Sequence, residues 1–174
     1  MRKILLIAAF VLVSLVSVSA QVNGKEIRDR DIEWEDFTGE VDSSSKFDAW
    51  TYWVTTYSYP APQFDGDVVR INLKVRLFLR NDSWVRPDKK ADRLLNHERG
   101  HFRIGRICAN EIEKTVNSTE FSRSNYRKEV DAIYWQIIEK CKQMNKQYDL
   151  DTNHYNNREQ QASWDKKLTE LLDK

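Results

Sequence analysis

Two patterns of hydrophobic residues divide the chain into a β-rich N-terminal half and a helical C-terminal half. Aromatic and β-branched residues dominate positions 47–59, a composition that favours a strand. Pro60-Ala61-Pro62 ends this strand, and Asp65-Gly66 marks a turn. From residue 69 to residue 79, apolar and mostly polar side chains alternate, which predicts a strand of an antiparallel sheet with one face in the core and one in water.

The C-terminal half carries apolar residues at a spacing of three or four, the period of an amphipathic helix. The spacing predicts a long helix from about residue 89 to about residue 115, with Asp88 as its N-cap. A second helix is predicted over 126–148, packed antiparallel to the first. The pattern lapses over 149–157, and a short last helix follows. We therefore expect an α+β fold, in which an antiparallel sheet packs beside the long helix and the second antiparallel helix.

The first twenty residues have the layout of a secretory signal peptide. Arg2 and Lys3 give a basic start, an apolar run follows, and Val18-Ser19-Ala20 offers a cleavage site. The apolar run is about thirteen residues long, shorter than the roughly 20 residues that a membrane-spanning helix needs. We expect residues 1–20 to be removed and residues 21–174 to form one exported domain, periplasmic or secreted, without stable insertion in the membrane.

The charge of the chain argues against two classes of partner. The formal net charge at pH 7 is +1, and loss of Arg2 and Lys3 makes it −1, since +1 − 2 = −1. Acidic and basic residues are mixed throughout, so nothing favours binding to nucleic acid or to an anionic membrane surface.

The two cysteines, Cys108 and Cys141, both fall on apolar faces of the predicted helices. In an oxidising compartment such a pair can form a disulfide. Two buried thiols that act as small hydrophobic residues are the alternative, and sequence spacing does not decide between them.

Residues 97–101 read His-Glu-Arg-Gly-His, an instance of H-E-x-x-H within the predicted long helix. Positions i and i+4 of a helix lie about 40° apart around the axis and about 6 Å along it, so both imidazoles can reach one metal ion. Glu98 then points beside the pair, where it can take a proton from a water molecule without binding the metal. Both histidines lie on the apolar face, where a solvated pair, the alternative interpretation, is costly. The motif predicts a Zn²⁺ site with Glu98 as general base.

Catalytic zinc normally has three protein ligands and one open position. The third histidine of the chain, His154, follows the second predicted helix and is the first candidate for the third ligand. Four carboxylates on predicted helices are alternatives that spacing does not exclude: Glu111, Glu113, Glu129 and Asp131. The longer motif H-E-x-x-H-x-x-G-x-x-H is absent, because Ile104 and Ile107 occupy its glycine and last histidine positions, so the chain is not a metzincin.

Four residues after the second predicted helix, or near its end, are candidates for supporting roles. Asp149 or Asp151 can accept the second ring N–H of a ligand histidine, although solvation in a loop is the simpler reading of Asp151. Tyr148 or Tyr155 can stabilise an oxyanion beside the metal. For Tyr148, burial in the apolar stripe of the helix is the alternative.

These motifs together resemble a family of bacterial proteins described as predicted secreted zinc-dependent proteases, a zincin-like domain of unknown function with an H-E-x-x-H-F motif. The resemblance covers nearly all of residues 21–174. Its marks are the segments 32–37, 83–84, 95–102 and 148–154, followed by Gln161 and Trp164. The resemblance implies that His154 is the third zinc ligand. Tyr155 departs from the family's T-x-H-G pattern, and this departure concerns the conformation of the loop.

Two functions follow from these features. The first is an exported zinc-dependent hydrolase, a peptidase or another amidase, that uses zinc-activated water. The alternative is a non-catalytic zinc-binding module of the cell envelope, in which a further protein ligand closes the fourth metal position. Cys108 shares the face of the two histidines but lies about 10 Å from His101 by helix rise, too far to be that ligand. A structural protein without metal is the third reading.

Overall fold

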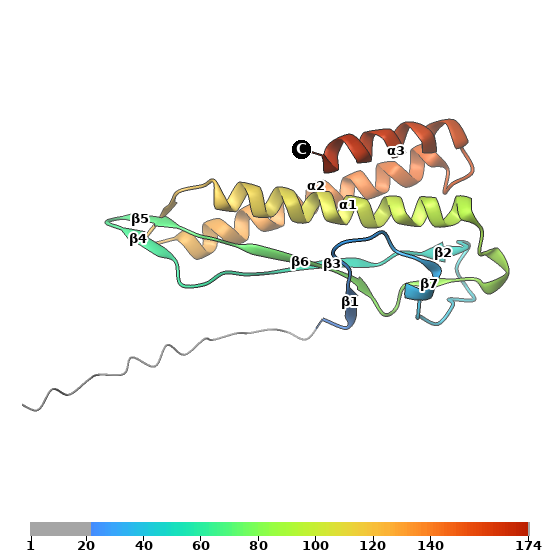
Figure 1. Ribbon diagram of the computed structural model, residues 1–174, viewed down its shortest axis with the longest axis horizontal. Coiled ribbons are helices and arrows are strands. Elements are labelled where there is room, and N and C mark those ends of the chain that lie inside the picture. The colour runs from blue at the N-terminus through green and yellow to red at the C-terminus, as the bar shows by residue number, and fades with distance from the viewer. Residues whose placement is uncertain (1–21, 174) are drawn as a thin grey trace, which may run out of the picture.

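The computed structural model describes residues 22–173, and the expected signal peptide lies outside this range. Within these residues two long helices cover the antiparallel sheets built by the N-terminal half, and a shorter last helix packs on the side of the two that faces away from the sheets (Figure 1). The predicted α+β class is confirmed. Within residues 22–173, no helix is both long enough and apolar enough to cross a membrane.

In the described part of the chain the strands form three small sheets, in which every pairing is antiparallel. The first sheet has the order β1 (Gly24–Glu26), β6 (Lys74–Arg80) and β3 (Trp53–Ser58). The second pairs β2 (Ala49–Trp50) with β7 (Trp84–Val85). The third has the order β4 (Gln63–Asp65), β5 (Val68–Arg70) and β8 (Phe121–Ser122), and it forms the end of the molecule farthest from β7 (Figure 1).

Both long strands that the pattern predicts are interrupted in the structure. Residues 47–59 form β2 and β3, because the chain changes partner from β7 to β6 between them. Residues 69–79 form β5 and β6. Between these two strands, Asn117 at the end of the long helix accepts a hydrogen bond from Leu73 N–H (2.6 Å) and donates one to Leu73 C=O (3.0 Å). A side chain thus takes the place of a neighbouring strand at Leu73.

The helices among residues 22–173 are α1 (Asp92–Asn117), α2 (Tyr126–Thr152) and α3 (Arg158–Leu172), with short 3-10 helices at Trp34–Asp36 and Pro87–Lys89. The predicted N-cap is wrong: Asp88 lies in the second 3-10 helix, and Ala91 precedes α1 without a side-chain cap. The second helix runs further than predicted, to Thr152. It ends in three consecutive left-handed residues, Asn153, His154 and Tyr155, with φ of 45°, 49° and 69°.

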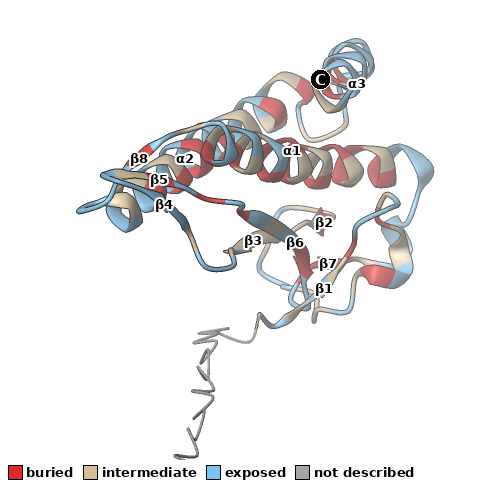
Figure 2. Ribbon diagram, turned by 60° about the vertical axis from the view of Figure 1, so that its left-hand side comes forward, coloured by how far each residue is buried: buried red, intermediate tan, exposed pale blue. Residues whose placement is uncertain are grey.

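Helix α1 is the centre of the fold, and buried residues (red) occur along its whole length (Figure 2). Gly105 lets α1 approach the first sheet closely, because a Cβ atom there would stand 2.8 Å from the ring of Trp53. On its other side α1 is joined to α2 by a disulfide between Cys108 and Cys141, both fully buried, with their Cα atoms 6.3 Å apart. The pairing that spacing left open is therefore present.

Candidate metal centre

The antiparallel packing of α1 and α2 brings three possible metal ligands together. His97 and His101 lie near the N-terminal end of α1, and Asp149 lies near the C-terminal end of α2. The two Nε2 atoms are 3.2 Å apart. Asp149 Oδ1 lies 3.2 Å from Nε2 of His97 and 3.1 Å from Nε2 of His101. These three side chains form a cluster that can hold a metal ion.

An amide oxygen faces the second nitrogen of each imidazole. Nδ1 of His97 lies 3.1 Å from Oε1 of Gln161, and Nδ1 of His101 lies 2.9 Å from Oδ1 of Asn145. An amide oxygen only accepts hydrogen bonds, so each Nδ1 carries the proton that it donates. In a neutral imidazole with this tautomer, Nε2 keeps the lone pair that a metal ion needs. Both rings are thus oriented for binding through Nε2.

Asp149 and His101 form a hydrogen-bonded pair that is largely removed from solvent, and each changes the pKa of the other. Burial alone lowers the pKa of His101, but the hydrogen bond to Asp149 and the charges of Asp149 and Glu98 outweigh it and raise this pKa to about 9. Burial raises the pKa of Asp149, but the hydrogen bonds from both imidazoles hold it well below its usual range. A divalent cation can replace the proton of the cluster, because metal ligands bind in their deprotonated forms.

The structure places His154 beside this cluster. Its Nδ1 lies 3.2 Å from Asp149 Oδ1, and its ring packs against Phe47 with the ring centres 4.7 Å apart. Asp149 Oδ1 therefore contacts a nitrogen of all three histidines. The group that can hold a metal contains Asp149 in addition to His97 and His101, and the role of His154 as a ligand stays a prediction.

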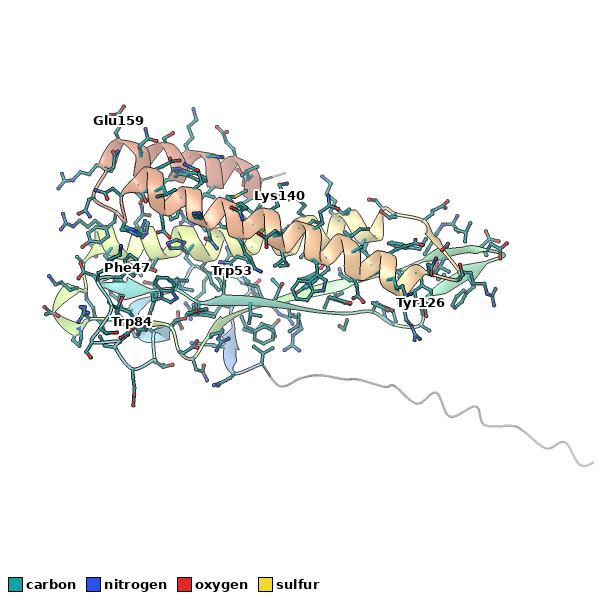
Figure 3. All side chains as sticks on the ribbon, turned by 180° about the vertical axis from the view of Figure 1, so that it is seen from behind. Phe47, Trp53, Trp84, Tyr126, Lys140 and Glu159 are labelled. Carbon is teal, nitrogen blue, oxygen red and sulfur yellow. A yellow bond between two sulfur atoms is a disulfide. The ribbon has the colours of Figure 1, made fainter. Side chains whose placement is uncertain are left out.

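A pocket of about 320 Å³ opens in front of these side chains. Its lining includes the segment 46–51 together with His97, Glu98, His101, Asp149 and His154. The pocket lies at the end of the molecule that carries Phe47 and Trp84, far from Tyr126 (Figure 3).

Glu98 lines the pocket without belonging to the ligand cluster. The residue is almost fully buried, at 3% exposure. Its Oε2 accepts a hydrogen bond of 2.6 Å from the hydroxyl of Thr51, which fixes the carboxylate on the pocket wall. Glu98 therefore shares a pocket with the cluster, and its role as a general base stays a prediction.

The two tyrosines have different positions. Tyr148 is fully buried behind His97: its ring stacks on the imidazole at 4.7 Å, and its hydroxyl donates to His97 C=O at 3.0 Å. It supports the histidine and does not line the pocket. Tyr155 does line the pocket, where its hydroxyl donates to Asp48. The left-handed conformation of Tyr155 explains why the resembling pattern has glycine at this position.

The other sequence candidates are engaged with partners outside the cluster. Asp151 accepts a hydrogen bond from the indole of Trp164 at 3.0 Å. The four alternative carboxylates bond as follows: Glu111 with Lys140, Glu113 with Lys74, Glu129 with Ser122, and Asp131 with Tyr57.

Sequence reasoning missed the amide side chains of Asn145 and Gln161 and the hydroxyl of Thr51. A signal existed for Asn145, because it precedes Asp149 by four residues and so shares its face of a helix. Gln161 belongs to the resemblance, but nothing in its spacing indicates a contact with His97. Thr51 is 47 residues from Glu98, and only the fold brings the two together.

Comparison with known proteins gives a family and no activity. The model of a family described as bacterial protein of unknown function (DUF922) matches residues 19–155. No curated protein matches the chain, and no solved structure does. The match supports the resemblance at the level of the family, and the protease activity that the resemblance implies stays a prediction.

Proposed function

The chain belongs to this family of bacterial proteins of unknown function, DUF922, and from its own side chains we propose that it is an exported zinc-dependent hydrolase, with Glu98 as general base. The donor set supports the metal. Imidazole nitrogens and a carboxylate oxygen are the usual protein ligands of catalytic zinc, and His97, His101 and Asp149 present them within 3.2 Å of one another. A bound zinc ion supplies a water molecule with a pKa near 7 and polarises a carbonyl group.

The position of Glu98 carries the proposal. A buried carboxylate that follows a ligand histidine, lines the same pocket and is held by Thr51 can take the proton of the attacking water. The same carboxylate can then return the proton to the leaving amine. A purely structural metal site has no need of such a group.

The part of the pocket lining that belongs to β2 supports a peptide as the substrate. Asp48 C=O accepts a hydrogen bond from Arg86 N–H, and Trp50 pairs with Trp84, so the backbone groups of these residues face β7. Backbone groups of an antiparallel strand alternate in direction, which turns those of Ala49 to the opposite edge. Ala49 lines the pocket, and within residues 22–173 β2 pairs with β7 alone. A strand edge without a strand partner can bind an extended peptide backbone.

One observation favours the alternative of a non-catalytic zinc-binding module. Asp149 Oδ1 contacts nitrogens of three histidines. If all four side chains bind one zinc ion, protein ligands fill the usual four positions and no position remains open to water.

The test combines metal content with hydrolysis. We expect the purified protein to bind one zinc ion per chain and to cleave members of a mixed peptide library, detected by mass spectrometry. Glu98→Gln keeps the hydrogen bond with Thr51 and should retain the zinc while losing turnover. Glu111→Gln, on the same helix but paired with Lys140, is the matched control and should retain both.

The outcomes separate the two functions. Turnover that survives in Glu98→Gln would reject the general-base role. A wild-type protein that binds zinc stoichiometrically but cleaves neither peptides nor other amides would support the module. A wild-type protein without affinity for zinc would reject both.

Export is the remaining part of the proposal. It is supported by the basic start, the short apolar run and the cleavage site in residues 1–20. We expect the mature protein to begin at Gln21 in the periplasmic or extracellular fraction. An intact N-terminus in the cytoplasmic fraction would contradict it.

A further inference from the structure

Helix α3 supplies a buried polar side chain, Gln161, to the ring nitrogen of His97 that does not face Asp149. Gln161, only 8% exposed, places Oε1 3.1 Å from His97 Nδ1. Its Nε2 donates two hydrogen bonds, one to the hydroxyl of Tyr148 (2.7 Å) and one to Oδ1 of Asp165 (2.9 Å). Both N–H groups of the amide are therefore used.

The direction of these hydrogen bonds follows from Asp165. An ionised carboxylate accepts hydrogen bonds and donates none, so Gln161 must present its NH₂ group to Asp165. Its oxygen then faces His97, and Nδ1 of His97 must carry a proton. In the neutral form that binds a metal ion, this tautomer has its lone pair on Nε2, the atom that lies 3.2 Å from Asp149 Oδ1.

Asp165 is itself held in place from α1. Its second oxygen, Oδ2, accepts a hydrogen bond of 2.8 Å from Nδ2 of Asn96, the residue before His97. Tyr148 completes the network in a consistent direction, since it accepts from Gln161 and donates to His97 C=O. Every donor in the network thus has an acceptor, and reversal of the Gln161 amide would set its oxygen against the Asp165 carboxylate.

We propose that Asp165, acting through Gln161, is a positioning residue that fixes the Nδ1–H tautomer of His97 and thereby prepares Nε2 for the metal ion. This inference rests on the metal site of the proposed function. Asp165 does not touch the ligand cluster, and it lies on α3, after residue 155 at which the family match ends. It follows that α3 is part of the metal centre as well as of the core, to which it contributes Trp164 and Leu168.

The test replaces the carboxylate with an amide of the same shape. In Asp165→Asn the side chain at 165 can donate as well as accept, so Gln161 can turn and the tautomer is no longer fixed. We expect zinc affinity, measured by competition with a chelator, to fall about ten-fold or more, as for loss of other groups that orient a ligand histidine. In ¹⁵N spectra of the metal-free protein, the Nδ1–H signal of His97 should weaken.

A second variant separates hydrogen-bond direction from packing. Gln161→Glu combined with Asp165→Asn exchanges the two groups. The carboxylate at 161 accepts from His97 Nδ1–H, from the amide at 165 and from the hydroxyl of Tyr148, which turns to it from His97 C=O. This double variant should recover the zinc affinity and the Nδ1–H signal. Asp151→Asn is the control, because Asp151 also anchors α3, through Trp164, without contacting Gln161; it should leave both readouts unchanged.

Any one of three results would overturn the inference. The first is an unchanged zinc affinity and an unchanged Nδ1–H signal in Asp165→Asn. The others are an equal loss of zinc affinity in Asp151→Asn, and no recovery of zinc affinity in the double variant. Failure of this inference can be told apart from failure of the proposed function. Even if the protein binds no zinc, the metal-free spectra still show whether Nδ1 of His97 carries a proton. Circular dichroism of each variant identifies any loss of folding, and the double variant then decides the result.

Discussion

The hydroxyl oxygen of Tyr148 lies 2.2 Å from the point at which a Cβ atom on Gly100 would stand. Tyr148 is fully buried, and its ring stacks on the imidazole of His97. The motif His-Glu-Arg-Gly-His therefore needs glycine at position 100, because the Tyr148 side chain of α2 lies so close to the backbone of α1 that no methyl group fits between them. Through this contact the packing of the two helices sets the position of a metal ligand.

We expect Gly100→Ala to destabilise the protein and to weaken metal binding. In an exposed helix the same change adds roughly 1 kcal/mol of stability, but overpacking of a core typically costs about 1–3 kcal/mol. Because Tyr148 must move, the His97 ring that it supports moves as well. Urea unfolding gives the change in stability, and chelator competition gives the change in zinc affinity. Asn110→Ala, at an exposed position of α1, is the control and should be neutral or slightly stabilising; a stabilising effect of Gly100→Ala would contradict the close contact.

The identity of the third ligand is tested by comparing Asp149→Asn with His154→Ala. The structure favours the larger loss of zinc affinity in Asp149→Asn, because Oδ1 of Asp149 lies within 3.2 Å of Nε2 of both His97 and His101. Loss of a group that only orients a ligand typically costs about 10–100-fold in affinity, so a ligand is recognised by a greater loss. Isothermal titration with zinc, or chelator competition for tight binding, gives both values.

The relative size of the losses in zinc affinity of Asp149→Asn and His154→Ala identifies the ligand set. A larger loss in His154→Ala would support the ligand set that the sequence predicts, with Asp149 as an orienting carboxylate. Equally severe losses in both variants would indicate four protein ligands and would favour the non-catalytic module. Asp131→Asn, on the same helix but bonded to Tyr57, is the control and should bind zinc as the wild type does.

The sequence predicts the fold class and the helices well, because the spacing of apolar residues reports which side of each element is buried. It does not predict where a strand changes partner. The breaks after Trp50 and after Arg70 depend on β7 and on Asn117, which are distant in the chain. The end of α2 was misplaced for a local reason: Asn153, His154 and Tyr155 adopt positive φ, a conformation that non-glycine residues seldom take.

The misplaced helix end also explains what was missed at the site. With α2 ending at 148, Asp149 falls in a loop and its spacing from Asn145 has no meaning. With α2 extended to Thr152, both residues point to one face, toward the histidines of α1. The motif in α1 needed no such information, because both histidines and Glu98 lie within five consecutive residues of one helix.

The disulfide between Cys108 and Cys141 should contribute substantially to stability. The two residues are separated by 33 positions, and closing a loop of this length stabilises a fold by about 3–4 kcal/mol in the chain-entropy model. We expect the double variant Cys108→Ala/Cys141→Ala to lose stability of this order in urea unfolding. A reducing agent should destabilise the wild type by a similar amount and leave the double variant unchanged. A wild type that is insensitive to complete reduction would contradict this contribution.

Asp36 should make the stability of the protein depend on pH in the acidic range. The residue is buried, accepts hydrogen bonds from Lys25 and Arg30 at 2.7 Å, and caps a 3-10 helix through Glu33 N–H at 2.9 Å. Burial raises the pKa of this carboxyl, but the bonds from Arg30, Lys25 and Glu33 outweigh it and hold the pKa well below its usual range. A pKa that is lower in the folded than in the unfolded chain stabilises the fold above the ordinary value near 4, and this stabilisation is lost as the pH falls below it.

We therefore expect Asp36→Asn to be less stable than the wild type by about 2 kcal/mol at pH 7, the order of a hydrogen bond to a charged group. The difference should shrink steadily below pH 4, because the wild-type carboxyl then becomes protonated in the unfolded chain, which binds that proton more readily than the folded one. Urea unfolding of both proteins between pH 7 and pH 3 measures the difference in the free energy of unfolding. The contributions of the other carboxyl groups cancel in this difference, because both proteins share them. Asp82→Asn, which breaks an exposed pair with Arg80, should change stability little at any pH. A constant difference between Asp36→Asn and wild type across this range would show that the ion pairs of Asp36 do not stabilise the fold.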